Sequence, residues 1–198
     1  MPINRDRLVG SALKLAPRLL GAVLTSEVGG LPVSARITEV EAYEGEDDPA
    51  SHAFRGRTPR TAVMFGPPGH LYCYFTYGMH WCANIVCGTD GTAAAVLLRG
   101  GEIVAGLDTA RDRRATARND SELGKGPARL AAALGLGALT NGVDLCSPLS
   151  PVRLEHLPSR RPRGVAAGPR IGITRAVELP WRFWFEGDPT VSRPARSG

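Results

Sequence analysis

Two carboxylates, Glu39 and Glu41, occur in the run VSARITEVEAY at residues 33–43, whose other side chains are mostly apolar or β-branched and favour a strand. Alternation with a period of two would place both carboxylates on one face together with Ile37 and Tyr43. In a cleft, such a carboxylate can take a proton from a reacting group, which is the chemistry of a general base. The pattern alone leaves open whether the charges form a solvent-exposed face or such a site.

Aromatic and polar side chains are concentrated in GHLYCYFTYGMHWCANIV at residues 69–86, which holds three of the four tyrosines. Flat and branched side chains favour strands, and Tyr77-Gly78 is typical of a turn, because glycine tolerates the positive φ of tight turns. The sequence therefore predicts a β-hairpin with the arms Leu71–Phe75 and His80–Val86. A large ring at the turn suggests that Tyr77 enters another molecule.

Metal chemistry is an alternative for the same hairpin. His70, Cys73, His80 and Cys82 could be zinc ligands, but the chain has no CxxC spacing, and packed thiols are common core residues. We therefore expect no metal, and reduced thiols in a cytosolic protein. His52 lies in a polar loop, and on the pattern alone it is better interpreted as a solvated residue.

Length and charge indicate a single domain with an anionic partner. The 198 residues suffice for a substantial core, and 43% hydrophobic and 22% charged residues are ordinary for a globular protein. The net charge is +5, and every basic side chain except Lys14 and Lys125 is arginine, whose fork suits phosphate. Nucleic acid is thus a natural partner, although codon bias would give the same composition. A helix is predicted to begin at Pro127, where Lys125 and Arg129 could contact phosphate.

The remaining segments are assigned from periodicity and turn residues. We expect a short N-terminal helix that ends before Pro17, a polar connector over residues 147–169, and fraying from Asp188 onward. No segment resembles a signal peptide or reaches the length of a membrane span, so we expect a cytoplasmic protein. Strands are expected at residues 20–27, 33–43, 92–99, 170–174 and 182–186, and a helix with a mobile loop at residues 103–107 and 108–122.

Several motifs combine into a specific pattern. They are ITEVEAY at 37–43, His52 nine residues after Tyr43, TPR at 58–60, MFGPPGHLYCYFTYGMHWCAN at 64–84, VLLR at 96–99 and GKGPARL at 124–130. With them the chain resembles the alkyladenine (3-methyladenine) DNA glycosylase family in its bacterial form, from about Leu15 to Val191. The resemblance implies one mixed α/β domain over residues 1–198, with a curved antiparallel sheet flanked by helices, a protruding hairpin and no cofactor.

The resemblance also implies roles for matching residues. Glu41 falls at the catalytic carboxylate that activates the attacking water, and Arg99 at a position beside the water and the backbone phosphate. The residues at the positions that hold the extruded base are Tyr43, His52, Tyr74 and Asn84, the last of which crowds the exocyclic amine of guanine.

Other implied roles concern the duplex. Tyr77 matches the side chain that fills the space left by the base, and Met79 and His80 follow it at the tip. His80 replaces the tyrosine of some relatives, and residues 134–157 follow the family only loosely. Lys125 and Arg129 stay the candidates for phosphate contacts.

The implied function is removal of alkylated or deaminated purines from duplex DNA by a monomeric, monofunctional glycosylase acting in base excision repair in a prokaryotic nucleoid. The substrates would be 3-methyladenine, 7-methylguanine, hypoxanthine and ethenoadenine. The alternatives are a non-catalytic nucleic-acid-binding module that uses the same tyrosines, and a hydrolase or transferase of small molecules on the same sheet. The presence of Glu41 disfavours the first, and the Tyr77 tip and the arginine content disfavour the second.

Overall fold

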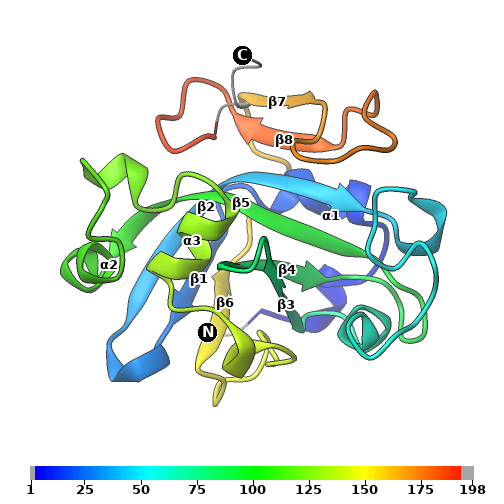
Figure 1. The fold of residues 1–198 in the computed structure, drawn as a ribbon, viewed down its shortest axis with the longest axis horizontal. Helices are drawn as coiled ribbons and strands as arrows, with labels where there is room; N and C mark the ends of the chain where they lie inside the picture. The colour runs from blue at the N-terminus through cyan, green and yellow to red at the C-terminus, as the bar shows by residue number, and fades with distance from the viewer. Residues whose placement is uncertain (1–2, 193–198) are drawn as a thin grey trace.

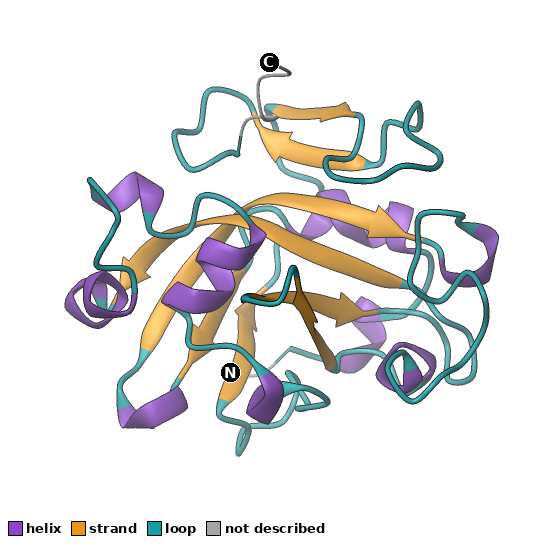
Figure 2. Cartoon of the chain, in the orientation of Figure 1, coloured by secondary structure: helices purple, strands orange, loops and turns teal. Residues whose placement is uncertain are grey.

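The computed structural model describes residues 3–192, which form three α-helices and an eight-stranded antiparallel sheet (Figures 1 and 2). This confirms the expected mixed α/β class. The helices are α1 (Ala12–Leu19), α2 (Leu107–Arg113) and α3 (Pro127–Ala133). The strands are β1 (Val23–Ser26), β2 (Val33–Tyr43), β3 (Leu71–Thr76), β4 (His80–Val86), β5 (Ala95–Ala105), β6 (Val152–His156), β7 (Val165–Gly168) and β8 (Arg182–Phe185).

One loop contacts both outer strands of the main sheet. The main strand order is β3-β4-β5-β2-β1-β6. The Leu71 amide in β3 donates to the Val143 carbonyl at 2.9 Å, and the Leu154 amide in β6 donates to the Leu145 carbonyl at 3.1 Å. Residues 143–145 therefore bridge the two edges, and the curved sheet packs around a core to which α1 and α3 also contribute buried side chains.

A β-bulge changes the phase of β2. Its core side is formed by odd-numbered residues up to Ile37 and by even-numbered residues from Val40. Pairing with β5 leaves Thr38 without a partner, as in a bulge. Ile37 consequently points into the core while Glu39 points to the other face, so the prediction that they share a face is wrong.

The bulge coincides with a fork in the sheet. On one edge of β2, residues 33–36 pair with β1, whereas residues 39–41 pair with β8. The β7–β8 ribbon, at the top of Figure 1, joins the sheet through the pairing of β8 with β2. The fork places β8 beside the half of β2 that carries the two carboxylates.

The predicted hairpin is confirmed. β3 and β4 are antiparallel, Tyr72 pairs with Asn84, and β3 extends one residue beyond the prediction to Thr76. Tyr77 and Gly78 form the turn with φ values of 51° and 67°. A left-handed conformation at a residue with a side chain costs about 1–2 kcal/mol, so the tip holds Tyr77 at some cost to stability.

Two helix predictions need correction. Asn4 caps only a short 3-10 turn, Arg5–Leu8, and α1 follows it and includes Pro17. Pro17 is buried within α1, where its nitrogen cannot donate a backbone hydrogen bond. The predicted helix at residues 103–107 is wrong because β5 continues to Ala105. A Cβ at Gly101 would lie 3.0 Å from Leu130 Cδ1, so this glycine serves close packing with α3 rather than a turn.

The C-terminal third is more ordered than expected. The connector over residues 147–169 contains β6 and β7, and residues 170–174 form a loop rather than a strand. Fraying from Asp188 is wrong for residues 188–192: Asp188 pairs with Arg36 at 2.9 Å, and the Ser192 amide donates to Glu39 at 2.7 Å. Residues 193–198 lie outside the described part.

Within residues 3–192, no helix has the length and apolar character needed to span a membrane. Among the same residues, no group of three His, Cys, Asp or Glu side chains could hold a metal ion. Cys73 points into the core, whereas Cys82 on the neighbouring strand points to the opposite face, so the hairpin thiols do not converge.

Candidate active site

A cavity of about 640 Å³ opens on the face of the sheet opposite the core. The end of β2, the strands of the hairpin and the middle of β5 supply part of its lining. Two loops add to the lining, residues 49–55 after β2 and residues 171–175 before β8. The bulge in β2 makes this possible, because after Thr38 it directs Glu39, Glu41 and Tyr43 to the cavity face and keeps Val40 and Ala42 in the core.

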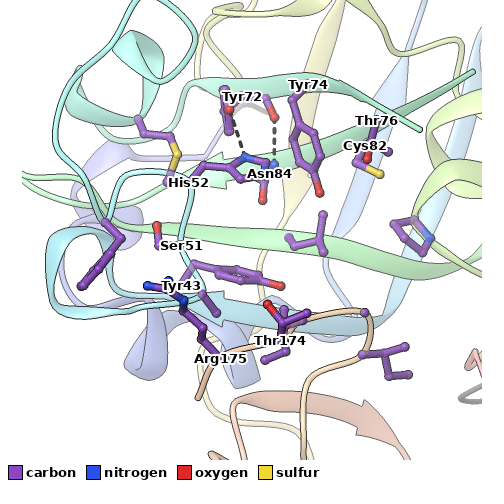
Figure 3. Close-up of a pocket in the computed structure, with 18 of the residues that line it drawn as sticks. Tyr43, Ser51, His52, Tyr72, Tyr74, Thr76, Cys82, Asn84, Thr174 and Arg175 are labelled. Atoms are coloured by element: carbon purple, nitrogen blue, oxygen red, sulfur yellow. Dashed lines mark hydrogen bonds between the residues drawn. The ribbon is translucent and has the colours of Figure 1, made fainter. Parts of the chain in front are cut away.

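Aromatic rings form two sides of the cavity. In Figure 3 the ring of Tyr43 faces His52, Tyr74 and Asn84 across an open space. His52 packs edge-on against Tyr74 with ring centroids 4.5 Å apart, and Tyr72 stacks on Tyr74 at 5.7 Å. The space between the two sides suits a flat aromatic ligand. Sequence reasoning missed Tyr72, although the period of two in β3 places it on the same face as Tyr74.

Hydrogen bonds fix the wall opposite Tyr43. Asn84 Nδ2 donates to the Tyr72 carbonyl at 3.1 Å, and His52 Nδ1 lies 3.3 Å from the Tyr72 hydroxyl. Partial burial and the charge of Arg60 lower the pKa of His52, which keeps the imidazole neutral near pH 7. A neutral ring can stack on a cationic base without charge repulsion.

Glu41 lies directly behind the cavity wall and is 0% exposed. Its Oε1 accepts a hydrogen bond from the Ile171 amide at 2.7 Å and lies 3.3 Å from Arg99 Nη1. Its Oε2 accepts from the Tyr43 hydroxyl at 2.8 Å. Tyr43, Arg99 and Ile171 all line the cavity, so the carboxylate is one side chain away from it.

Burial sets the basicity of this carboxylate. It raises the pKa of Glu41 above the ordinary 4.5, and it outweighs the lowering of that pKa by Arg99, the Ile171 amide and the Tyr43 hydroxyl. The charge of Glu39 raises the pKa further. A carboxylate in this environment is oriented by three donors and is a stronger base than one in water.

Arg99 connects Glu41 to the second buried carboxylate. Its Nε lies 3.2 Å from Glu39 Oε1, and Glu39 also binds Arg182 at 3.0 Å and the Ser192 amide at 2.7 Å. Glu39 is thus an ion-pair partner of both Arg99 and Arg182. The sequence predicted a strand over residues 92–99 that ends at Arg99. In the structure, β5 continues beyond Arg99, and its pairing with β2 skips this residue, which therefore lies in the irregular region of the ladder.

The hairpin tip extends the cavity outward. Tyr77 is 80% exposed and still contributes to the cavity lining, and Met79 is 68% exposed. His80, the first residue of β4, is also exposed. The tip thus presents an aromatic ring, a thioether and an imidazole to solvent. It lies beside the aromatic slot, which is the space between Tyr43 on one side and His52 and Tyr74 on the other.

Arginines surround the mouth of the cavity. Arg55 and Arg175 line it from opposite loops, and the Arg60 guanidinium lies 5.8 Å above the Tyr74 ring. In the described part of the chain, none of the three forms a salt bridge. Sequence reasoning did not select these residues, since loop arginines look like ordinary solvated residues.

The predicted phosphate residues flank the start of α3. Pro127 lines the cavity, Lys125 Nζ donates to the Pro189 carbonyl at 2.8 Å, and Arg129 is exposed. Sequence reasoning also missed the buried pair of Asp48 and Arg170 beside Tyr43, because no local pattern signals a contact between residues 122 positions apart.

Comparisons with known proteins identify the family of this chain. The sequence model of the methylpurine-DNA glycosylase (MPG) family matches residues 7–189. A protein of Streptomyces avermitilis is 52% identical over 193 residues, covering 96% of this chain and 91% of its own length. Proteins of Leifsonia xyli subsp. xyli (54% over 197 residues, 96% and 91%) and Burkholderia lata (49% over 183 residues, 92% and 87%) are also similar. All three carry the provisional name 3-methyladenine DNA glycosylase. The chain therefore belongs to the methylpurine-DNA glycosylase family and is a DNA glycosylase.

Proposed function

We propose that this enzyme flips alkylated or deaminated purines out of duplex DNA and hydrolyses their N-glycosidic bond, leaving an abasic site. Its substrates would include 3-methyladenine, 7-methylguanine, hypoxanthine and ethenoadenine. The observation that carries the proposal is the position of Glu41, a buried carboxylate of raised pKa directly behind an aromatic slot. The slot has the volume for a base, and the exposed Tyr77 stands at its rim.

Glu41 would act as the general base. A carboxylate offers about four lone-pair sites, and three are used by the Ile171 amide, Arg99 and the Tyr43 hydroxyl. The fourth, on Oε2, would be the one that binds the attacking water. As the C–N bond breaks, its electron pair leaves with the base, the water oxygen bonds to the sugar carbon, and the water proton passes to Glu41. The carboxylate charge also favours the oxocarbenium character of the sugar.

The leaving base determines what else is needed. An N-alkylated purine is cationic and leaves as a neutral molecule, so one carboxylate suffices. Hypoxanthine or ethenoadenine is neutral and requires a proton, for which an ordered water is the source that we propose.

Tyr43, His52 and Tyr74 would sandwich the base, and electron-rich rings favour a cationic partner. Asn84 would crowd the exocyclic amine of guanine and so disfavour the normal base.

The hairpin tip would support flipping. Extrusion of a base costs a few kcal/mol, and a side chain that fills the vacated space offsets part of this cost. Tyr77 would be this wedge, with Met79 and His80 in contact with the neighbouring bases or the opposite strand. The arginines at the mouth of the cavity (Arg55, Arg60 and Arg175), together with Lys125 and Arg129, would bind backbone phosphates. The enzyme would act as a monomer.

The cleavage product distinguishes hydrolysis from amine chemistry. Glycosylases that cut the strand attack the sugar with an amine. This chain has two lysines, of which Lys14 is exposed on α1 and Lys125 binds the Pro189 carbonyl. A duplex with a single hypoxanthine or ethenoadenine should therefore stay intact until it is heated in alkali. Borohydride added during turnover should trap no protein–DNA adduct, and a trapped adduct would refute the role of Glu41.

A further inference from the structure

A buried ion pair lies beneath the aromatic slot. The side chains of Asp48 and Arg170 are both 0% exposed. Arg170 Nη2 donates to Asp48 Oδ1 at 2.9 Å, and Arg170 Nη1 donates to Asp48 Oδ2 and, at 2.9 Å, to the Ala42 carbonyl. The bidentate geometry brings one full negative charge against one full positive charge.

The cation of this pair covers Tyr43. The Arg170 guanidinium lies 4.6 Å from the centroid of the Tyr43 ring and 4.9 Å from that of Trp181, so it is held between the two rings. Arg170 does not line the cavity, whereas Tyr43 does. Arg170 therefore contacts the face of the Tyr43 ring that points away from the bound base, and a base in the slot would stack on the other face.

A cation on one face of an aromatic ring weakens attraction for a second cation on the other face. It draws π-electron density toward itself, and its charge also acts through the ring. A base stacked on Tyr43 at an ordinary contact distance of about 3.5 Å would lie roughly 8 Å from the guanidinium. Without a counter-ion, Arg170 would thus disfavour a positively charged base and leave a neutral base almost unaffected.

We propose that Asp48 is a specificity-determining residue: by neutralising Arg170 from behind, it keeps the cavity face of Tyr43 attractive to cationic, N-alkylated purines. The inference rests on the proposed function and adds to it, because it assigns the preference for charged lesions to a residue outside the cavity lining. No acidic side chain other than Asp48 pairs with Arg170 in the described part of the chain.

The expected size of the effect follows from Coulomb's law. At roughly 8 Å and an effective dielectric constant of about 20–40, an uncompensated charge changes the affinity for a cationic base by about tenfold. The relevant quantity is a ratio: the enzyme concentration at half-maximal single-turnover rate for a duplex with 7-methylguanine, divided by that for a duplex with hypoxanthine. The first lesion is cationic and the second is neutral, so general damage to the pocket cancels in the ratio.

Asp48→Asn keeps the shape of the side chain and removes its charge, and it should raise the ratio about tenfold. Asp48→Asn combined with Arg170→Gln removes both charges and should return the ratio to that of the unmodified enzyme. Asp47→Asn is the matched control, because it removes the same charge from an exposed neighbour and should leave the ratio unchanged. Thermal melting of each variant reports the folded fraction, since breaking a buried pair is destabilising.

The proposal would be overturned if Asp48→Asn changed the half-maximal enzyme concentration equally for both lesions, or if the ratio stayed raised in the double variant. Either result would mean that the pair only stabilises the loop after β2. If Asp48→Asn does not fold, Arg170→Met provides the test, because it removes the cation and leaves Asp48 near the face of Tyr43 that points away from the cavity. The ratio should then fall below that of the unmodified enzyme, and an unchanged or raised ratio would refute the inference. An unmodified enzyme that excises neither lesion would instead refute the proposed function itself.

Discussion

The Tyr43 hydroxyl donates a hydrogen bond to Glu41 Oε2 at 2.8 Å, so a ring that lines the aromatic slot is bonded to the buried carboxylate behind it. A base that stacks on Tyr43 therefore contacts a residue that also orients Glu41. This geometry couples recognition of the base to the group that would activate water, and substitutions at the two residues can separate the contributions.

Tyr43→Phe removes the hydroxyl and keeps the ring. The hydroxyl lowers the pKa of Glu41, so its loss should raise that pKa further above 4.5. Glu41 must be ionised to act as the general base, so excision falls as the pH drops through its pKa. In Tyr43→Phe, the acidic limb of the pH–rate profile should therefore shift to higher pH. The measurement is single-turnover excision between mildly acidic and neutral pH, with lesion binding as the control. An unshifted limb would show that the hydroxyl does not act on the catalytic carboxylate.

Glu41→Gln tests the base itself. The amide keeps the shape of the side chain but cannot accept a proton from water, so excision should fall by about 10²–10⁴. Lesion binding should largely survive, because Tyr43, His52 and Tyr74 are unchanged. Single-turnover rates and gel-shift affinities measured on the same duplex distinguish the two effects. Near-normal excision by this variant would disprove the assignment.

Tyr77→Gly tests the wedge and the strained turn together. The φ of 51° is natural for glycine, so stability should stay the same or rise by up to about 1 kcal/mol. Excision should fall about tenfold or more, because the wedge offsets part of an unstacking cost of a few kcal/mol. Leu149→Ser removes another apolar side chain, one that is 92% exposed and precedes β6 at the other edge of the sheet, and it should change neither quantity. A large loss of stability in Tyr77→Gly would place the ring in a structural role.

Salt dependence tests the cationic rim. Each phosphate neutralised on B-DNA contributes about −0.9 to the slope of log affinity against log salt. Arg175→Gln should make the slope less steep by about this amount. Arg111→Gln is the control, because Arg111 already pairs with Asp108 and Asp120. A flat salt dependence of the unmodified enzyme would mean that its arginines solvate the surface and do not bind DNA.

The sequence predicts best where local chemistry and structure agree. The hairpin was predictable because its strand-forming side chains and its Tyr77-Gly78 turn point to the same structure. α3 was predictable from Pro127 at its first turn. The end of β5 was not, because Gly100-Gly101 resembles a turn, and only the position of Leu130 shows why glycine is required there.

The site was predictable as a set of residues and not as a geometry. The resemblance selected Tyr43, His52, Tyr74 and Asn84, and these residues line one cavity. That Ile37 faces the core while Glu39 and Glu41 face the opposite side depends on the bulge at Thr38, which an alternating pattern cannot express. Contacts between distant segments, such as that of Ile171 with Glu41, leave no trace in local periodicity.

The bulge in β2 has a consequence for how this enzyme can change. The alternation of inward-facing and outward-facing residues in β2 shifts by one residue at Thr38. Before Thr38 the odd-numbered residues pack in the interior, and after it the even-numbered residues do so. The odd-numbered residues after Thr38 can thus be substituted to suit a different ligand, while Val40 and Ala42 continue to pack in the interior. Loss of the single residue Thr38 would instead exchange the two sets, putting charge inside the protein and hydrocarbon in the slot.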